Sequence, residues 1–224
     1  MKGILYGVGV GPGDPQLLTL KAISIIEKCK VIAVPTTGKQ NNIALKIISE
    51  YVEGKEILEC FMPMTYDEKE LAKYHQEASE KICKMLEQEI DVCFVTLGDP
   101  SIYATYSYLH NIVSAEGYTT ELVPGVPSFC AAAAALNISL CENNTPLHII
   151  PSSYSGEALD LDGTKVLMKA GKNIHTVIDK IQEKGLLSDS MMVEKCGMNG
   201  EKIYSNLHDA KGETSYFSTI IVKS

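Results

Sequence analysis

The sequence predicts an α/β protein with two α/β domains, the first built on a mostly parallel sheet and the second on a mixed sheet. Three observations lead to this class. Strand and helix patterns alternate through the first half, turns rich in glycine and proline follow three strands, and the last two strands have no obvious helix between them. Strand–helix alternation is typical of a parallel sheet covered by helices on both faces.

The elements of the first half follow from their residue patterns. The chain opens with a strand at Gly3–Val10 that ends in glycines, and Leu17–Cys29 repeats apolar residues at helical spacing. Val31–Val34 is a short apolar strand that Pro35 stops. The same periodicities predict helices at Ile43–Tyr51, Asp67–Glu89 and Ser101–Glu116, and strands at Ile57–Phe61, Asp91–Leu97 and Thr119–Val123.

The second half is less regular. The alanine run Ala131–Ala135 lies in a strong helix-forming segment, and Ser152–Asp162 is a polar loop. The other predicted elements are strands at Leu147–Ile150, Val166–Met168, Met191–Glu194 and Ser215–Val222, and a helix at Ile174–Lys184. We place the domain boundary within Glu116–Pro124, which predicts domains of residues 1–118 and 119–224.

Composition excludes several classes of function. The net charge of the 224 residues is −8, which argues against a nucleic-acid partner, and no apolar run reaches the roughly 18 residues that span a bilayer. The start of the chain does not resemble a signal peptide, so we expect a soluble, cytoplasmic protein without a membrane partner. The seven cysteines and five histidines lack metal-ligand spacing, and we expect no metal site. All 20 basic residues are lysines, so lysines, backbone N–H groups and helix N-termini must hold any anionic substrate.

The first motif, GVGVGPGDPQLLTLKA, spans Gly7–Ala22 and joins a strand to a helix. A dinucleotide fingerprint needs a glycine where Pro12 stands, and a phosphate-binding loop needs a glycine–lysine pair that is absent. A plain strand-to-helix turn is the alternative. Four glycines and two prolines exceed what a simple turn requires, so we favour a turn that approaches a ligand closely.

Two further motifs also follow strands. LGDPSIYATYSYL spans Leu97–Leu109 after an apolar strand, and PGVPSFCAAAA spans Pro124–Ala134. Open α/β sheets bind ligands at the carboxyl ends of their strands, so both motifs are candidates for a binding site. Helix packing alone is the alternative explanation of the alanine run.

Together these segments resemble the tetrapyrrole (precorrin) methylase family, which shows G-x-G-P-G-D-P-x-L-L-T-L-K-A, then G-D-P after the fourth strand, then P-G-[IV] before small residues. The resemblance covers nearly the whole chain. Gly98–Leu109, Phe61–Thr65 and Pro124–Phe129 resemble the branch that methylates C-20 of a precorrin-2-type ring. Branch members often carry an arginine where this chain has Tyr66.

The resemblance implies an S-adenosylmethionine-dependent C-methyltransferase of cobalamin biosynthesis, which releases S-adenosylhomocysteine. Its small-molecule substrate would be precorrin-2 or cobalt-factor II, and the protein would be a homodimer. The first domain would form the substrate side and the second the cofactor side of a cleft between them. The implied cofactor contacts are Gly98, Asp99, Pro100, Ile102, Tyr103, Ser128, Phe129, Lys169, Ala170, Cys196, Ser218 and Thr219.

Substrate and acid–base residues are expected on the glycine turn and among the lysines. Asp14 is the candidate proton acceptor, and a helix N-cap is its alternative role. The candidate substrate-binding residues are Gly11, Pro12, Gly13, Lys39 and Lys195, and solvated surface charges are the alternative for the two lysines.

Other functions remain open. Within the family they are a methylase of another ring carbon, a diphthine-forming methylase and a ribosomal-RNA ribose methylase; the acidic charge argues against RNA. A nucleotide-binding oxidoreductase and a non-catalytic tetrapyrrole-binding protein belong to different classes. Binding of adenosylmethionine rather than NADH would separate a methyltransferase from an oxidoreductase.

Overall fold

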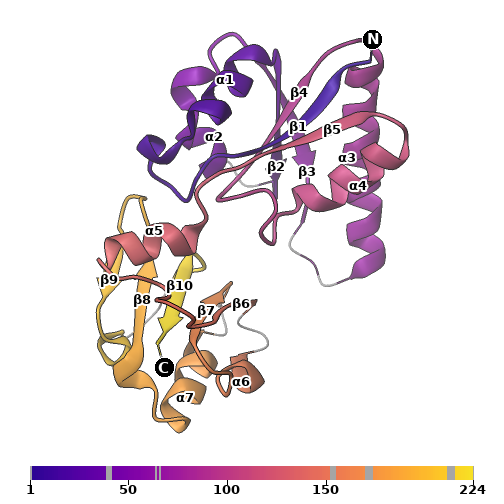
Figure 1. Cartoon of the computed structure of the whole chain (residues 1–224). Coiled ribbons are helices and arrows are strands. Elements are labelled where there is room, and N and C mark those ends of the chain that lie inside the picture. Colours follow the sequence, from indigo (N-terminus) through magenta and orange to yellow (C-terminus); the bar gives the residue numbers. More distant parts are fainter. Residues whose placement is uncertain are drawn as a thin grey trace. The chain divides into compact units, whose positions relative to one another are not determined.

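The chain divides into two compact units, Met1–Pro127 and Ser128–Ser224 (Figure 1). This computed structural model describes residues 2–38, 42–63, 65, 67–151, 155–169, 174–210 and 215–223. Among the predicted site residues, Lys39 and Ala170 lie outside the described ranges.

The first unit contains a fully parallel five-stranded sheet in the order β3-β2-β4-β1-β5. Its strands are β1 (Ile4–Gly9), β2 (Val31–Thr36), β3 (Glu56–Phe61), β4 (Val92–Thr96) and β5 (Thr119–Val123). The helices between them are α1 (Leu20–Lys28), α2 (Ile43–Ile47), α3 (Glu68–Glu87) and α4 (Tyr106–Ala115). The predicted parallel sheet is therefore confirmed.

Helices cover both faces of this sheet (Figure 1). Alternate strand residues point to opposite faces, so Tyr6 and Val8 of β1 join the core under α1 and α2, while Leu5 joins the core under α3 and α4. All five residues of β4 are buried, as expected of a central strand with both faces covered.

Two helices begin later than predicted because of their local backbone. Thr19 caps α1 by accepting a hydrogen bond from the Ala22 N–H at 3.1 Å, and a short 3₁₀ helix at Pro15–Leu17 precedes it. The helix predicted from Ser101 begins at Tyr106, because Tyr103 has a left-handed backbone with φ of +48°.

The second unit contains a mixed sheet in the order β6-β7-β10-β8-β9, which confirms that prediction. Its strands are β6 (Leu147–Pro151), β7 (Thr164–Met168), β8 (Ser190–Glu194), β9 (Lys202–Tyr204) and β10 (Ser218–Val222), and its helices are α5 (Ser128–Ala135), α6 (Ser155–Ala158) and α7 (Ile174–Glu183). The short β9 and α6 were not predicted. Each has too few residues to show a periodicity.

The two units separate after Pro127, later in the chain than the predicted boundary at residue 118. The physical reason is the position of β5, which pairs in parallel with β1 from Ile4↔Thr119 to Val8↔Val123. This strand completes the first sheet and therefore belongs with the first unit.

None of the helices that the structure describes is long and apolar enough to cross a membrane.

Candidate functional site

The three sequence motifs meet at one edge of the first sheet. They follow β1, β4 and β5, and these strands are neighbours in the sheet order. Because the strands are parallel, their carboxyl ends lie at the same edge. The topology thus brings together turns that are about 90 and 30 residues apart in the chain, as expected for a ligand site in an open α/β sheet.

Backbone hydrogen bonds join the first two turns directly. The Val10 N–H donates to the Thr96 carbonyl at 2.9 Å, which extends the pairing of β1 and β4 beyond the strands. Gly11 and Gly98 then exchange a pair of hydrogen bonds, with N···O distances of 3.3 and 2.8 Å. The two glycine-rich turns therefore form one continuous backbone surface.

Several motif glycines are explained by close packing. A Cβ atom on Gly7 would overlap the buried ring of Tyr106. A Cβ atom on Gly9 would lie 2.5 Å from the Gly98 oxygen, and one on Gly125 would overlap that same oxygen. These glycines let three backbones touch, so their first role is structural.

Asp99 holds the second and third turns together. Its Oδ1 accepts hydrogen bonds from the backbone N–H and the hydroxyl of Ser101, and its Oδ2 accepts one from the Gly125 N–H at 3.0 Å. The other predicted residues of this turn differ in exposure: Pro100 is buried, Ile102 is half-buried and Tyr103 is 44% exposed. Asp99 therefore serves as a positioning residue for the loop on which they lie.

Asp14 caps a helix, which is the alternative role expected from the sequence. Its Oδ1 accepts a hydrogen bond from the Gln16 N–H at 2.8 Å at the start of the 3₁₀ helix. The residue is half-buried, as is Gly13, while Gly11 and Pro12 are buried. Capping uses one carboxylate oxygen, so a role for Asp14 in proton transfer stays a prediction.

The predicted cofactor residues of the second unit gather at one edge of its sheet. The strands β7 and β8 both run antiparallel to β10, so their carboxyl ends lie beside the beginning of β10. This places Lys169 after β7, and Cys196 after β8, at the edge where Ser218 and Thr219 begin β10. Four residues from three segments are thus brought together within this unit.

Two lysines at this edge have unusual backbones. Lys169 and Lys195 each follow the last residue of a strand with φ of +59° and +49°. The Lys195 N–H donates to the Phe217 carbonyl at 2.7 Å, which keeps this left-handed turn against β10. Left-handed backbone is rare for residues other than glycine, and it is more common at functional sites.

The remaining predicted contacts of this unit are largely buried. Phe129 lies at the start of α5, which packs against β8 and β10, and the neighbouring Ser128 is half-buried. Burial raises the pKa of the Cys196 thiol to about 11, so it stays protonated at neutral pH. The Ser218 hydroxyl donates to the Ser215 carbonyl at 2.6 Å.

Sequence reasoning missed Glu194 at the end of β8. It pairs directly with Ser218 in the sheet register, it is 3% exposed, and its Oε1 has no hydrogen-bond partner among the described residues. Buried polar atoms are normally paired, so this oxygen marks a place where a ligand could complete the hydrogen bonding. The sequence does show one sign of this residue, which is a glutamate at the end of an otherwise largely apolar strand.

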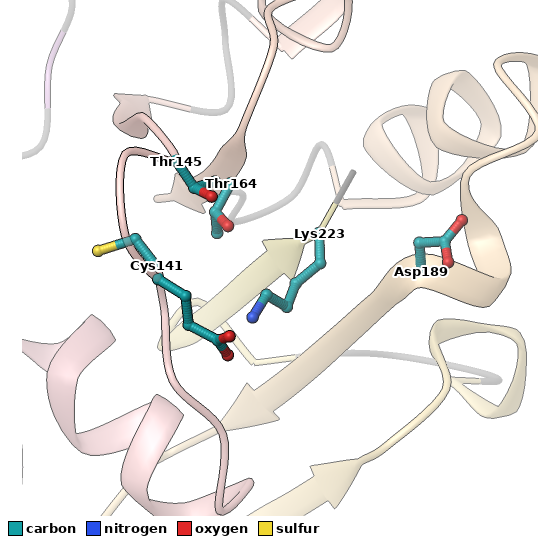
Figure 2. A pocket seen from close by; sticks show the side chains of 6 residues that line it. Cys141, Thr145, Thr164, Asp189 and Lys223 are labelled. Carbon is teal, nitrogen blue, oxygen red and sulfur yellow. The ribbon is translucent and has the colours of Figure 1, made fainter.

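A polar hollow of about 530 Å³ lies elsewhere in the second unit (Figure 2). It is lined by Cys141, Glu142, Thr145, Thr164, Asp189 and Lys223. Thr164 begins β7 and Lys223 follows β10, so the hollow is at the sheet edge opposite Lys169 and Lys195. It contains none of the predicted site residues.

Comparisons with known proteins agree with the motifs. The family model described as Tetrapyrrole (Corrin/Porphyrin) Methylases matches residues 4–211. A probable cobalt-precorrin-2 C(20)-methyltransferase of Methanocaldococcus jannaschii is 40% identical, over 80% of this chain and 77% of the relative. The cobalt-precorrin-2 C(20)-methyltransferase of Salmonella typhimurium is 30% identical, over 99% of this chain and 97% of the relative.

A solved structure shares the fold. The cobalamin biosynthetic enzyme cobalt precorrin-4 methyltransferase, CbiF, superposes with a TM-score of 0.76 at 21% identity, covering 98% of this chain and 94% of that one. At this identity the similarity shows a common architecture of one parallel and one mixed sheet.

Proposed function

The chain belongs to the tetrapyrrole (corrin/porphyrin) methylase family, and from this premise we propose that it transfers a methyl group from S-adenosylmethionine to C-20 of a precorrin-2-type ring. The observation that carries the proposal is the joined edge of the first sheet, where the three family motifs meet through their backbones. A dinucleotide or phosphate loop has a different pattern of glycines, which disfavours an oxidoreductase.

We infer the donor contacts from the family resemblance. In the first unit they are Gly98, Asp99, Pro100, Ile102 and Tyr103, and in the second Ser128, Phe129, Lys169, Ala170, Cys196, Ser218 and Thr219. The unpaired oxygen of Glu194 beside Ser218 supports a ligand with N–H or O–H groups at this edge. Adenosylmethionine carries such groups on its adenine, ribose and amino-acid parts, so the residues fit it.

When bound, the donor would supply an electrophilic methyl group on a sulfonium cation. The residues of the chain would mainly bind and orient the reactants and exclude water. The backbones of the glycine turns can approach a ligand closely because they carry few side chains. The Oδ2 of Asp14, which is not the oxygen that caps the Gln16 N–H, would accept the proton that C-20 loses, and lysines would hold the ring carboxylates.

The proposal also covers the form of the ring, the oligomeric state and the cellular location. Both relatives carry cobalt-precorrin-2 in their names, so we propose the cobalt form as the first ring to test and the metal-free form as the alternative. We further propose a homodimer that works in the cytoplasm. Gly11, Pro12, Gly13, Lys39 and Lys195 are proposed to bind the ring.

Incubation with adenosylmethionine and each ring under anaerobic conditions tests the function. We expect one added methyl group by mass spectrometry, placed at C-20 by NMR, together with S-adenosylhomocysteine. Methylation of another ring carbon would overturn the position. Tight binding of NADH without any response to adenosylmethionine would overturn the methyltransferase itself.

A further inference from the structure

Lys169 and Lys195 share a combination of features that the described chain shows at no other pair of strand ends. Each immediately follows a strand, each has positive φ, and the two strands flank β10 in one sheet. The chain contains no arginine, so lysines are its only permanently basic side chains. The two residues therefore place two ammonium-bearing side chains along a single sheet edge.

The sheet geometry sets the distance between the two lysines. Neighbouring strands lie about 4.8 Å apart, and β10 separates β7 from β8, so the two strand ends are about 10 Å apart. Ser218 pairs with Glu194, and continuing the register of β7 with β10 places Lys169 opposite Ser218. The two lysines are therefore almost level along the strands.

The choice of lysine at these positions has an energetic cost. A residue with a Cβ atom is less stable than glycine in left-handed backbone by about 1–2 kcal/mol. Glycine occupies this conformation at many turns of the chain, including Gly163, Gly185 and Gly197. Desolvation by the surrounding protein also lowers the pKa of Lys169, a further cost of keeping its charge. Both positions nevertheless carry a lysine, which puts two cationic side chains at this edge.

We propose that the ammonium groups of Lys169 and Lys195 together anchor two carboxylates of the substrate ring. The inference rests on the proposed function and deepens it, since the ring carries several carboxylated side chains. In this proposal the side chain of Lys169 contacts the ring, whereas its proposed contact with the donor is through the backbone. Bidentate recognition by one arginine would be replaced by two separate ammonium groups.

The test compares Lys169→Met and Lys195→Met with Lys169→Gly and Lys195→Gly in methyl transfer to cobalt-precorrin-2. Each methionine variant should raise the KM for the ring about tenfold, the typical effect of losing a charged hydrogen bond. The affinity of each methionine variant for S-adenosylhomocysteine should fall by less than its KM for the ring rises. Each glycine variant should lose the same ring affinity and gain about 2–4 °C in Tm, because it removes backbone strain.

Lys223→Met is the matched control, because Lys223 is a lysine of the same unit at the opposite sheet edge. Its KM for the ring should stay at the wild-type value. An unchanged KM in both methionine variants would overturn the anchor, as would a loss of S-adenosylhomocysteine affinity equal to the rise in KM. If the wild-type chain methylates neither ring, the proposed function itself fails, which is a distinct result.

Discussion

The candidate sites at the two sheets are built differently. The first lies at the carboxyl ends of β1, β4 and β5, and the second lies where β7 and β8 end and β10 begins. At the first edge, three turns touch through backbone atoms, and glycine is required because a Cβ would overlap a neighbouring chain at Gly9 or Gly125. At the second edge, the unusual features lie at individual residues. A buried oxygen of Glu194 has no hydrogen-bond partner among the described residues, and Lys169 and Lys195 have left-handed backbones.

The first edge therefore depends on how backbones pack, whereas the second edge depends on groups that could bind a ligand. Substitutions at the first edge should act mainly on folding, because they change how the backbones fit together. Substitutions of Lys169, Lys195 and Glu194 at the second edge should act mainly on binding, because these residues carry the proposed contacts to the ring and the donor.

The largest effect is expected for Gly125→Ala. The added methyl group would overlap the Gly98 carbonyl oxygen and approach the Gly9 backbone, so the free energy of unfolding should fall by about 3 kcal/mol or more. Urea unfolding followed by circular dichroism measures this change. Gly156→Ala is the control, since its Cβ would meet only the end of the Lys180 side chain, at 3.4 Å. Equal stability of the two variants would contradict the packing argument.

Asp14→Asn tests whether a side chain at the first edge takes part in the reaction. Asparagine keeps the oxygen that caps the Gln16 N–H, so stability should stay within about 0.5 kcal/mol of the wild type. Turnover should fall about 100-fold if the carboxylate accepts the proton from C-20. Steady-state kinetics at saturating donor and ring provide the measurement.

Asp67→Asn is the control for this substitution, because Asp67 caps α3 through the N–H groups of Lys69 and Glu70 and has no proposed role in the reaction. Normal turnover of Asp14→Asn with an intact fold would remove Asp14 from the mechanism and leave it a capping residue.

The smallest effect is expected for Glu194→Gln, and it should appear as weaker binding of the donor site's ligand. Replacing the unpaired carboxylate oxygen with an amide weakens its ability to accept hydrogen bonds from the donor, so the affinity for S-adenosylhomocysteine should fall about tenfold. Isothermal titration calorimetry measures the affinity. Glu142→Gln, in the hollow at the opposite edge, should bind as the wild type does. Identical affinities of both variants would mean that Glu194 does not contact the donor.

Much of the fold could be predicted because its signals are local. The fully buried β4 appears as an apolar run and the long α3 as an amphipathic repeat, and both were found where the sequence places them. The family motifs likewise predicted which turns matter. The start of α4 was misplaced because the left-handed backbone of Tyr103, a residue that usually avoids it, gave no sign in the sequence.

The candidate site was only partly predictable for a related reason. The residues around Gly98 and Ser218 were predicted from the family resemblance. Glu194 was missed because its distinguishing feature is a buried oxygen without a hydrogen-bond partner among the described residues. A missing hydrogen bond depends on every neighbour of an atom, and those neighbours come from several strands. The capping role of Asp14, in contrast, involves residues two apart and could be stated in advance.

The alternation of strands and helices and the position of the turns could be read from the sequence, because each depends on residues close together in the chain. The absence of arginine follows from composition alone. Three features required the folded chain: β5 completes the first sheet, the backbones of Gly9, Gly98 and Gly125 touch, and the strands that precede Lys169 and Lys195 are about 10 Å apart. Strand order brings distant residues into contact, and no local pattern specifies it.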